Sequence, residues 1–242
     1  MNIIKRNIPN ILTLTNLTSG LFATLFAISG DLELAAICIF IGVLFDFSDG
    51  FVARILKANS ELGKQLDSLA DLISFGVAPG MILFQLIHIS ITSEKFLSTT
   101  DIELSTLYPT MAAFLIPIFS AIRLGKFNLD TSQSSVFIGL PTPASAIIIA
   151  SLPLIIKYQF PNYILDTSIL LIISIILPIL LIAKLHLFSL KMNKKEQLYS
   201  QLNIFRMILI ISAIILFYYF VFAAIPFIVI LYIILSLLNN ML

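Results

Sequence analysis

The chain has 242 residues, of which 59% are hydrophobic and 11% are charged, and its formal net charge is +1. Soluble domains carry about 25% charged residues. This composition excludes a water-soluble globule, because a fold of this size cannot bury so much apolar surface. The near-neutral charge gives no basic balance for nucleic acid, and we expect no such partner. The length predicts a single membrane domain over residues 1–242.

Uncharged apolar runs divide the chain into candidate membrane spans, because a hydrocarbon core about 30 Å thick needs about 20 apolar residues per helix. The first six expected spans cover residues 7–30, 34–57, 67–91, 107–123, 142–156 and 168–187. Residues 207–242 carry no charge and are too long for one crossing, so we divide them near residues 223–226, where Pro226 ends or kinks a helix. The sequence predicts an all-α, multi-pass transmembrane helical bundle of six to eight spans, with eight as the favoured count and extra C-terminal helices over residues 168–242.

The positions of lysine and arginine set the expected orientation of the bundle. With the N-terminus in the cytoplasm, twelve of the fourteen basic residues face the cytoplasm, and only Lys95 and Lys157 face the outside. We therefore expect a protein of the cell (inner) membrane with a cytoplasmic N-terminus.

Four aspartates form the clearest chemical pattern. Asp46 and Asp49 are three residues apart, and Asp67 and Asp71 are four apart, so each pair shares one face of its helix. Both pairs fall near the expected cytoplasmic ends of spans two and three, and the short turn between these spans lets the carboxylates converge. Four carboxylates at membrane depth are costly unless a cation compensates them. Hard carboxylate oxygens suit Mg²⁺, Mn²⁺ or Ca²⁺, so we expect one or two divalent ions.

The residues alone leave other interpretations of this cluster open. The carboxylates could form a solvated loop between spans, although their shared register and the small residues between them disfavour it. They could also line a proton or cation pathway, because acidic residues inside membranes serve transporters as well.

Small residues accompany the aspartates. Gly50 follows the first aspartate by one turn, Gly63 precedes the third by one turn, and Ala53 adds another small position, so a second helix or a flat ligand can approach closely. Arg54 lies two turns beyond the first aspartate, where a guanidinium can bind a phosphate through a fork of hydrogen bonds.

These positions form one continuous pattern over residues 46–71, Asp46-x-x-Asp49-Gly50-x-x-Ala53-Arg54-x8-Gly63-x3-Asp67-x3-Asp71. The pattern resembles the signature of the CDP-alcohol phosphatidyltransferase family at all eight fixed positions. Flanking segments resemble members of that family that use serine as the acceptor; these are residues 9–13, 63–71, 74–79, 123–128 and 139–144. The resemblance extends from about residue 5 to residue 145.

The resemblance implies an enzyme with a cytoplasm-facing active site. The donor would be CDP-diacylglycerol, held with its acyl chains in the bilayer, and the acceptor would be L-serine, whose hydroxyl attacks the phosphorus while CMP leaves. The resemblance also implies that Asp46, Asp49 and Asp67 bind two Mg²⁺ or Mn²⁺ ions. Asp71 would be a further ligand or the general base, because a serine hydroxyl needs a positioned base. A homodimer is implied as well.

The remaining candidate residues follow from the same resemblance. Gly50 and Ala53 would let the nucleotide lie close to the helix, and Arg54 would contact the donor phosphates. Arg123 and Lys126 are candidates for binding the serine carboxylate or a phosphate, with anchoring under the positive-inside rule as the alternative. The last two candidates would contact the cytidine or the donor, although helix capping and inter-helix hydrogen bonds explain them equally well; they are Asn10 and Thr13.

Two rival functions stay open. Family members with another acceptor, such as glycerol 3-phosphate or inositol phosphate, share the signature and differ only in the flanking segments. A cation transporter that uses the carboxylate cluster as its ion site is the rival from another class, and it would have no need of Gly50, Ala53 and Arg54.

Overall fold

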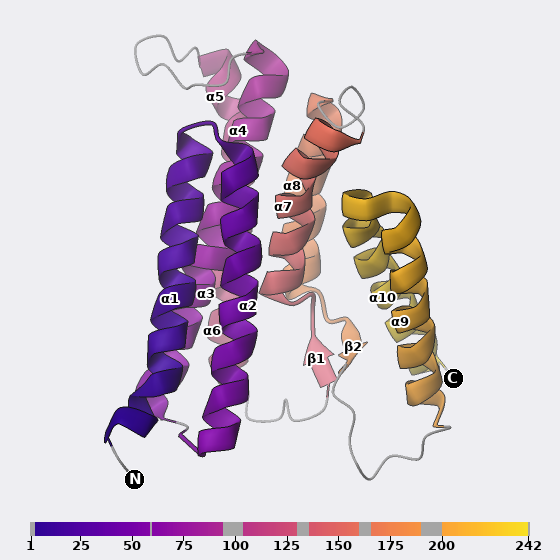
Figure 1. Cartoon of the computed structure of the whole chain (residues 1–242). Helices are drawn as coiled ribbons and strands as arrows, with labels where there is room; N and C mark the ends of the chain where they lie inside the picture. Colours follow the sequence, from indigo (N-terminus) through magenta and orange to yellow (C-terminus); the bar gives the residue numbers. More distant parts are fainter. Residues whose placement is uncertain are drawn as a thin grey trace.

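The computed structural model describes residues 3–58, 60–93, 104–129, 136–159, 166–189 and 200–241, and within these it shows a helical bundle with one short two-stranded ribbon (Figure 1). The helices are α1 (Ile3–Ile28), α2 (Leu32–Leu56), α3 (Glu61–Leu72), α4 (Ala78–Thr92), α5 (Leu104–Thr110), α6 (Leu115–Leu129), α7 (Thr142–Tyr158), α8 (Thr167–Ile182), α9 (Gln201–Phe220) and α10 (Ala224–Met241). Shorter elements are the π-helical η1 (Ile73–Val77), the 3₁₀-helical η2 (Met111–Phe114) and η3 (Val221–Ala223), and the strands β1 (Val136–Ile138) and β2 (His186–Phe188).

The described residues contain five helical segments that are long and apolar enough to cross a membrane: Asn7–Ile28, Leu32–Leu56, Glu61–Thr92, Leu104–Leu129 and Gln201–Met241. Two further apolar helices, Thr142–Tyr158 and Thr167–Ile182, are shorter. A helical multi-pass membrane fold is therefore the architecture of this chain. The count of eight spans and the orientation of the N-terminus stay predictions, and Lys95, one of the two basic residues expected outside, lies beyond the described residues.

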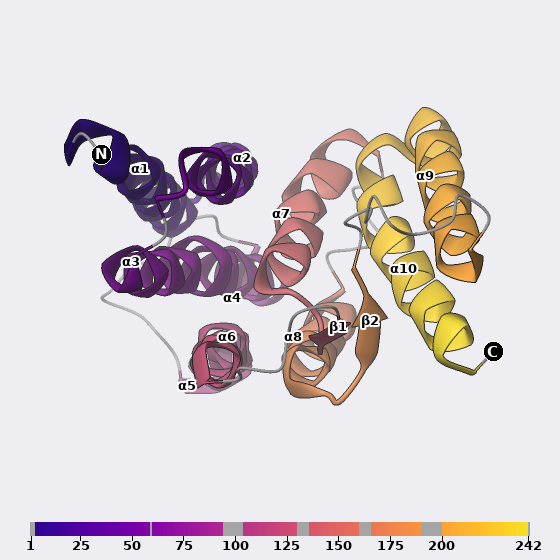
Figure 2. The ribbon, with the colours of Figure 1, turned by 90° about the horizontal axis from the view of Figure 1, so that it is seen from below.

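The long C-terminal apolar segment is folded back on itself. Val221 has a φ of 43°, which ends α9, and α10 begins at Ala224. The two helices lie side by side in both ribbon views (Figures 1 and 2). The division expected near residues 223–226 is thus found at the neighbouring turn over Val221–Ala223.

The core lies between α1, α2, α4 and α7, and small residues let these helices approach closely. On α1 and α2 the side chains of Ala23, Ala27 and Ala35 are fully buried. At the crossing of α1 with η1, a Cβ on Gly20 would lie 2.3 Å from Ser74 Oγ, so this contact requires glycine. Figure 2 shows α3 and α4 between the α1–α2 pair and α6, which places α3 beside both.

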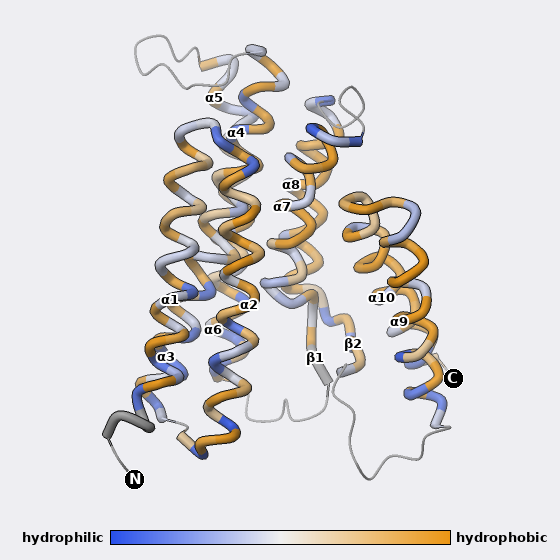
Figure 3. Tube along the Cα trace, viewed as in Figure 1, coloured by the Kyte–Doolittle hydropathy of each residue, from blue (hydrophilic) through white to orange (hydrophobic). Residues whose placement is uncertain are grey.

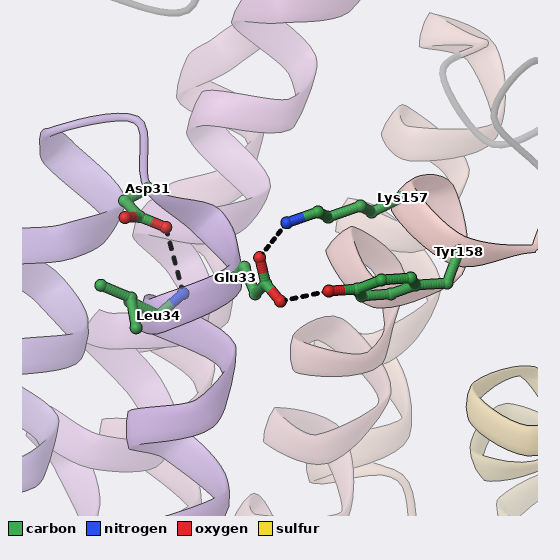
Figure 4. Close-up of polar contacts among 5 residues, drawn as sticks. All are labelled: Asp31, Glu33, Leu34, Lys157 and Tyr158. Atoms are coloured by element: carbon green, nitrogen blue, oxygen red, sulfur yellow. Dashed lines mark hydrogen bonds and ion pairs between the residues drawn. The ribbon is translucent and has the colours of Figure 1, made fainter.

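Two contacts join the ends of the bundle that lie away from the α2–α3 turn. Glu33 at the start of α2 accepts hydrogen bonds from Lys157 and Tyr158 at the end of α7, and the Lys157 contact is also an ion pair (Figure 4). Asp31 caps α2 by accepting from the Leu34 backbone N–H at 3.2 Å. The two contacts of Glu33 join α7 to α2, while the Asp31 cap stabilises the start of α2 itself.

The antiparallel ribbon of β1 and β2 was not expected from the sequence. Its register pairs Val136 with Phe188 and Ile138 with His186. The chain then enters α7 through Gly139, whose φ is +76° and whose added Cβ would lie 2.4 Å from the Leu181 carbonyl oxygen. This turn requires glycine, and it holds the ribbon against the end of α8.

Candidate active site

Three carboxylates converge where the end of α2 meets the start of α3. Ligand oxygens of Asp46, Asp49 and Asp67 all lie within 4.8 Å of one another. Asp71, one turn further along α3, is buried and its carboxyl group lies within hydrogen-bonding reach of Asp46. The structure therefore brings together all four aspartates that the sequence singled out. Figure 3 shows hydrophilic stretches in this part of α1, α2 and α3.

Helix α1 supplies the hydrogen bonds that orient two of these carboxylates. Thr13 Oγ1 donates to Asp49 Oδ2 at 2.6 Å, and Asn16 Nδ2 donates to Asp71 Oδ1 at 3.4 Å. Ser74 Oγ in turn donates to the Asn16 carbonyl oxygen at 2.9 Å. For Thr13 the sequence left donor contact and an inter-helix hydrogen bond open; the structure shows the inter-helix bond, and contact with the donor stays a prediction. Neither hydrogen bond to an aspartate could be found from spacing, because α1 and the aspartates are far apart in the sequence.

A cavity of about 530 Å³ opens beside the carboxylates. Six of the expected site residues line it, together with Gly63 and Lys64: Asn10, Thr13, Asp49, Gly50, Ala53 and Asp67. A Cβ added to Gly50 would meet nothing within 4 Å, so this glycine leaves free space in front of the helix. On both α2 and α3, therefore, the cavity wall combines a carboxylate with small residues.

Arg54 does not line this cavity, and its side chain is exposed. Eight residues correspond to about 80° of rotation beyond two full turns of an α-helix. Arg54 therefore points to one side of the direction taken by Asp46. Contact between Arg54 and a ligand in the cavity stays a prediction.

The donor set fits a hard divalent cation. All three clustered ligands are carboxylates, and neither histidine nor cysteine belongs to the described cluster. Carboxylates at this spacing repel one another strongly where water is scarce, unless a cation lies between them. Oxygen-only ligands are those that Mg²⁺ and Mn²⁺ prefer. The cluster can therefore bind a metal ion.

Arg123 and Lys126 line a second cavity, of about 240 Å³, rather than the first one. Its other lining residues come from the end of α6, the ribbon and the end of α8: Phe127, Ile138, Leu181, Ile182, Lys184 and His186. Arg123 is 9% exposed; its Nη1 donates to Thr142 Oγ1 at 3.4 Å, and its Nε has no hydrogen-bond partner in the described structure. It is also close enough to Asp71 for charge attraction.

A polar bridge that the sequence did not predict fixes α3 against α6. Asn128 Nδ2 donates to Ser68 Oγ at 2.7 Å, and Lys64 Nζ donates to the Asn128 carbonyl oxygen at 3.1 Å. Because α3 carries Asp67 and α6 carries Arg123, this bridge sets the position of the basic cavity relative to the carboxylates. Lys184 and His186 were likewise missed as site residues, since no spacing pattern connects them with α6.

The fold and site define a helical membrane protein with a carboxylate metal site beside a ligand cavity, and comparison with known proteins agrees with this class. The family model described as CDP-alcohol phosphatidyltransferase matches residues 6–190. This chain belongs to the CDP-alcohol phosphatidyltransferase family.

Individual relatives are similar over the same part of the chain. A CDP-diacylglycerol–serine O-phosphatidyltransferase of Bacillus subtilis is 35% identical over 136 residues, which cover 56% of this chain and 69% of the relative. An enzyme with the same name from Mycobacterium leprae is 34% identical and covers 63% of this chain and 48% of the relative. An archaetidylserine synthase of Methanothermobacter thermautotrophicus is 34% identical and covers 60% of this chain and 56% of the relative. The match thus spans about half to two thirds of these relatives.

Proposed function

We propose that this protein transfers the phosphatidyl group from CDP-diacylglycerol to the hydroxyl of L-serine, giving phosphatidylserine and CMP. The observation that carries the proposal is the convergence of Asp46, Asp49 and Asp67 beside a cavity that two of them, Asp49 and Asp67, line together with small residues. Family membership supports the transferase over the cation transporter, and the names of the relatives support serine as the acceptor.

The first cavity is proposed as the site of the donor headgroup. Gly50 and Ala53 leave room for the nucleotide against α2, and Asn10 supplies an amide at the cavity wall that can bind cytidine. Lys64 adds a positive charge for the donor phosphates, and Arg54 would join it only by turning from its exposed position.

The aspartates are proposed to hold Mg²⁺ or Mn²⁺, and the family resemblance implies two such ions. When bound, such ions neutralise the pyrophosphate and stabilise the charge on the leaving CMP. Asp46, Asp49 and Asp67 would be ligands, and Thr13 would orient Asp49 for this role. Asp71 would serve as a ligand or accept the proton of the serine hydroxyl.

The second cavity is proposed as the site of the acceptor. Arg123 is nearly buried with an unpartnered Nε, and a guanidinium in that state binds a carboxylate strongly. Lys126 lines the same cavity. Because Arg123 also attracts Asp71, an acceptor carboxylate held at Arg123 would have its hydroxyl near the proposed base.

The proposed enzyme is a homodimer of the cell (inner) membrane with both cavities open to the cytoplasm. Basic residues at the ends of α2, α3, α6 and α8 support this orientation under the positive-inside rule.

Purified protein in detergent tests the function. CMP release from CDP-diacylglycerol would be measured with serine, glycerol 3-phosphate or inositol phosphate offered separately. We expect release that requires serine. CMP release with a different acceptor would support the phosphatidyl transfer and overturn serine as the acceptor. Ion flux without CMP release would favour the cation transporter.

A further inference from the structure

The C-terminal hairpin of α9 and α10 lies beyond the residues that the family model matches, yet it holds strand β2 by its backbone. Arg206 donates from Nε and Nη2 to the Ser189 carbonyl oxygen, at 2.9 and 2.7 Å. Tyr232 Oη donates to the Phe188 carbonyl oxygen at 2.8 Å, and Asn240 Nδ2 donates to the His186 carbonyl oxygen at 2.7 Å. Three side chains of the hairpin thus bind three carbonyl groups within four residues.

These contacts satisfy backbone carbonyl groups at the edge of β2, as pairing with a third strand would. A two-stranded ribbon is marginally stable on its own, and its outer edge presents unpaired backbone groups. Among the described residues, β2 pairs with β1 through three residues, and side chains of the hairpin donate hydrogen bonds to carbonyl groups of β2 and of the residue after it. The ring of Phe188 also packs edge-on against Tyr232, with 5.2 Å between ring centroids, and Leu209 and Leu235 complete this apolar contact.

The burial of Arg206 indicates that the hairpin does more than pack against lipid. Its side chain is 5% exposed, and it is the one charged residue of α9. A buried arginine in a membrane protein is costly, and such residues mark functional positions more often than lipid-facing structure. Its guanidinium is directed at one carbonyl group next to β2 and at Asn203 Oδ1, 2.8 Å away.

What the hairpin holds is one wall of the basic cavity. His186 belongs to β2, and Lys184 lies two residues before it, between α8 and the strand. Both line the cavity that contains Arg123 and Lys126, and so does Ile138 on β1. The side chains of Lys184 and His186 are exposed, so packing around these side chains does not fix their position and the backbone must do so.

We propose that Lys184 and His186 form a further wall of the acceptor site, and that Arg206, Tyr232 and Asn240 are positioning residues that hold this wall. The inference rests on the proposed function, because it takes the basic cavity as the place where serine binds. Lys184 adds a cation to those of Arg123 and Lys126, and His186 adds a hydrogen-bonding ring. The carboxylate of serine would thereby be held from both α6 and the segment that leads into β2.

Steady-state kinetics of the full-length protein in detergent test the inference through Tyr232→Phe and Asn240→Ala. Each change removes one hydrogen bond to β2, and Tyr232→Phe leaves the packed ring in place. We expect the KM for serine to rise about three- to tenfold, the range for the loss of one hydrogen bond, while the KM for CDP-diacylglycerol stays unchanged. Tyr218→Phe is the matched control, because it removes the same hydroxyl from an exposed position on the same hairpin.

A double variant separates positioning from general stabilisation. If Asn240 acts through His186, then Asn240→Ala should add little to the KM for serine in a His186→Ala background. Equal changes in the KM values for both substrates, or a loss of kcat that follows the melting temperature, would overturn the inference and leave the hairpin as a structural support. Wild-type protein that uses serine while both variants keep its KM would overturn the inference alone. Wild-type protein that ignores serine would overturn the proposed function and the inference with it.

Discussion

Thr13 Oγ1 donates a hydrogen bond of 2.6 Å to Asp49 Oδ2 across the interface of α1 and α2. The hydroxyl is buried, and it also contacts the Pro9 carbonyl oxygen at 3.1 Å. A carboxylate fixed in this way has less freedom to turn away from the cluster formed with Asp46 and Asp67. The relationship gives α1, which carries no acidic residue, a direct part in shaping the proposed metal site.

Thr13→Val should weaken metal dependence, because valine keeps the shape of threonine and removes the hydroxyl. Loss of a group that orients a metal ligand lowers affinity about 10- to 100-fold. We therefore expect the Mn²⁺ concentration for half-maximal CMP release to rise by about tenfold or more. Thr18→Val is the control, since its hydroxyl bonds only to the Leu14 carbonyl oxygen on the exposed face of the same helix. An unchanged metal requirement in Thr13→Val would remove Thr13 from the site.

Asp67→Asn and Asp71→Asn should each abolish turnover while the protein still inserts and purifies as a folded species. Loss of a positioned base alone lowers rates about 10²- to 10⁴-fold, and loss of a metal ligand should be at least as severe. Asp166→Asn is a matched control, because Asp166 is exposed and caps α8 through the Ser168 N–H, a role that asparagine fills equally well. Retained transferase activity in both site variants would contradict the assigned roles.

Gly50→Leu should separate binding from folding. A Cβ at Gly50 meets nothing within 4 Å, and leucine favours the helix by up to about 1 kcal/mol over glycine. The melting temperature should therefore be kept or raised, while the larger side chain fills the donor cavity and raises the KM for CDP-diacylglycerol. Gly20→Ala should do the reverse, since its Cβ would lie 2.3 Å from Ser74 Oγ. A Gly50→Leu variant with an unchanged donor KM would place the nucleotide elsewhere.

The orientation can be tested by labelling single cysteines after Cys38, the natural one, has been replaced by alanine. Ser29→Cys lies in the turn between α1 and α2, and Gln65→Cys lies on the exposed face of α3. In right-side-out membrane vesicles, an impermeant maleimide should label Ser29→Cys at once and Gln65→Cys only after permeabilisation. The opposite pattern would place the active site outside the cell.

Much of the site could be predicted because its chemistry is local in sequence. The i, i+3 and i, i+4 spacing placed each aspartate pair on one helix face, and the short α2–α3 turn brought the pairs together. Span boundaries were less certain at charged ends. The third span was expected to begin near residue 67, whereas α3 begins at Glu61, where Ser60 Oγ caps it by accepting from the Gly63 N–H at 3.0 Å.

The parts that could not be predicted depend on contacts between distant segments. Strands β1 and β2 contain three residues each and are separated by two helices, so they are too short for a periodic pattern in the sequence to predict them. The same holds for Thr13 with Asp49 and for Asn128 with Ser68, because neither pair shares an element. Helical register gives Arg54 a direction about 80° from that of Asp46, but its exposure depends on how neighbouring helices pack, which spacing within α2 does not show.

The most direct test of the central claim follows isotope-labelled serine into lipid. Purified protein, CDP-diacylglycerol, labelled L-serine and Mg²⁺ or Mn²⁺ would be combined, and the lipid product would be identified by mass spectrometry. The account predicts labelled phosphatidylserine and CMP in equal amounts, loss of both with a chelator, and their return when the metal is restored. Folded protein that forms no labelled phosphatidylserine under these conditions, or forms it equally well in chelator, would contradict the account.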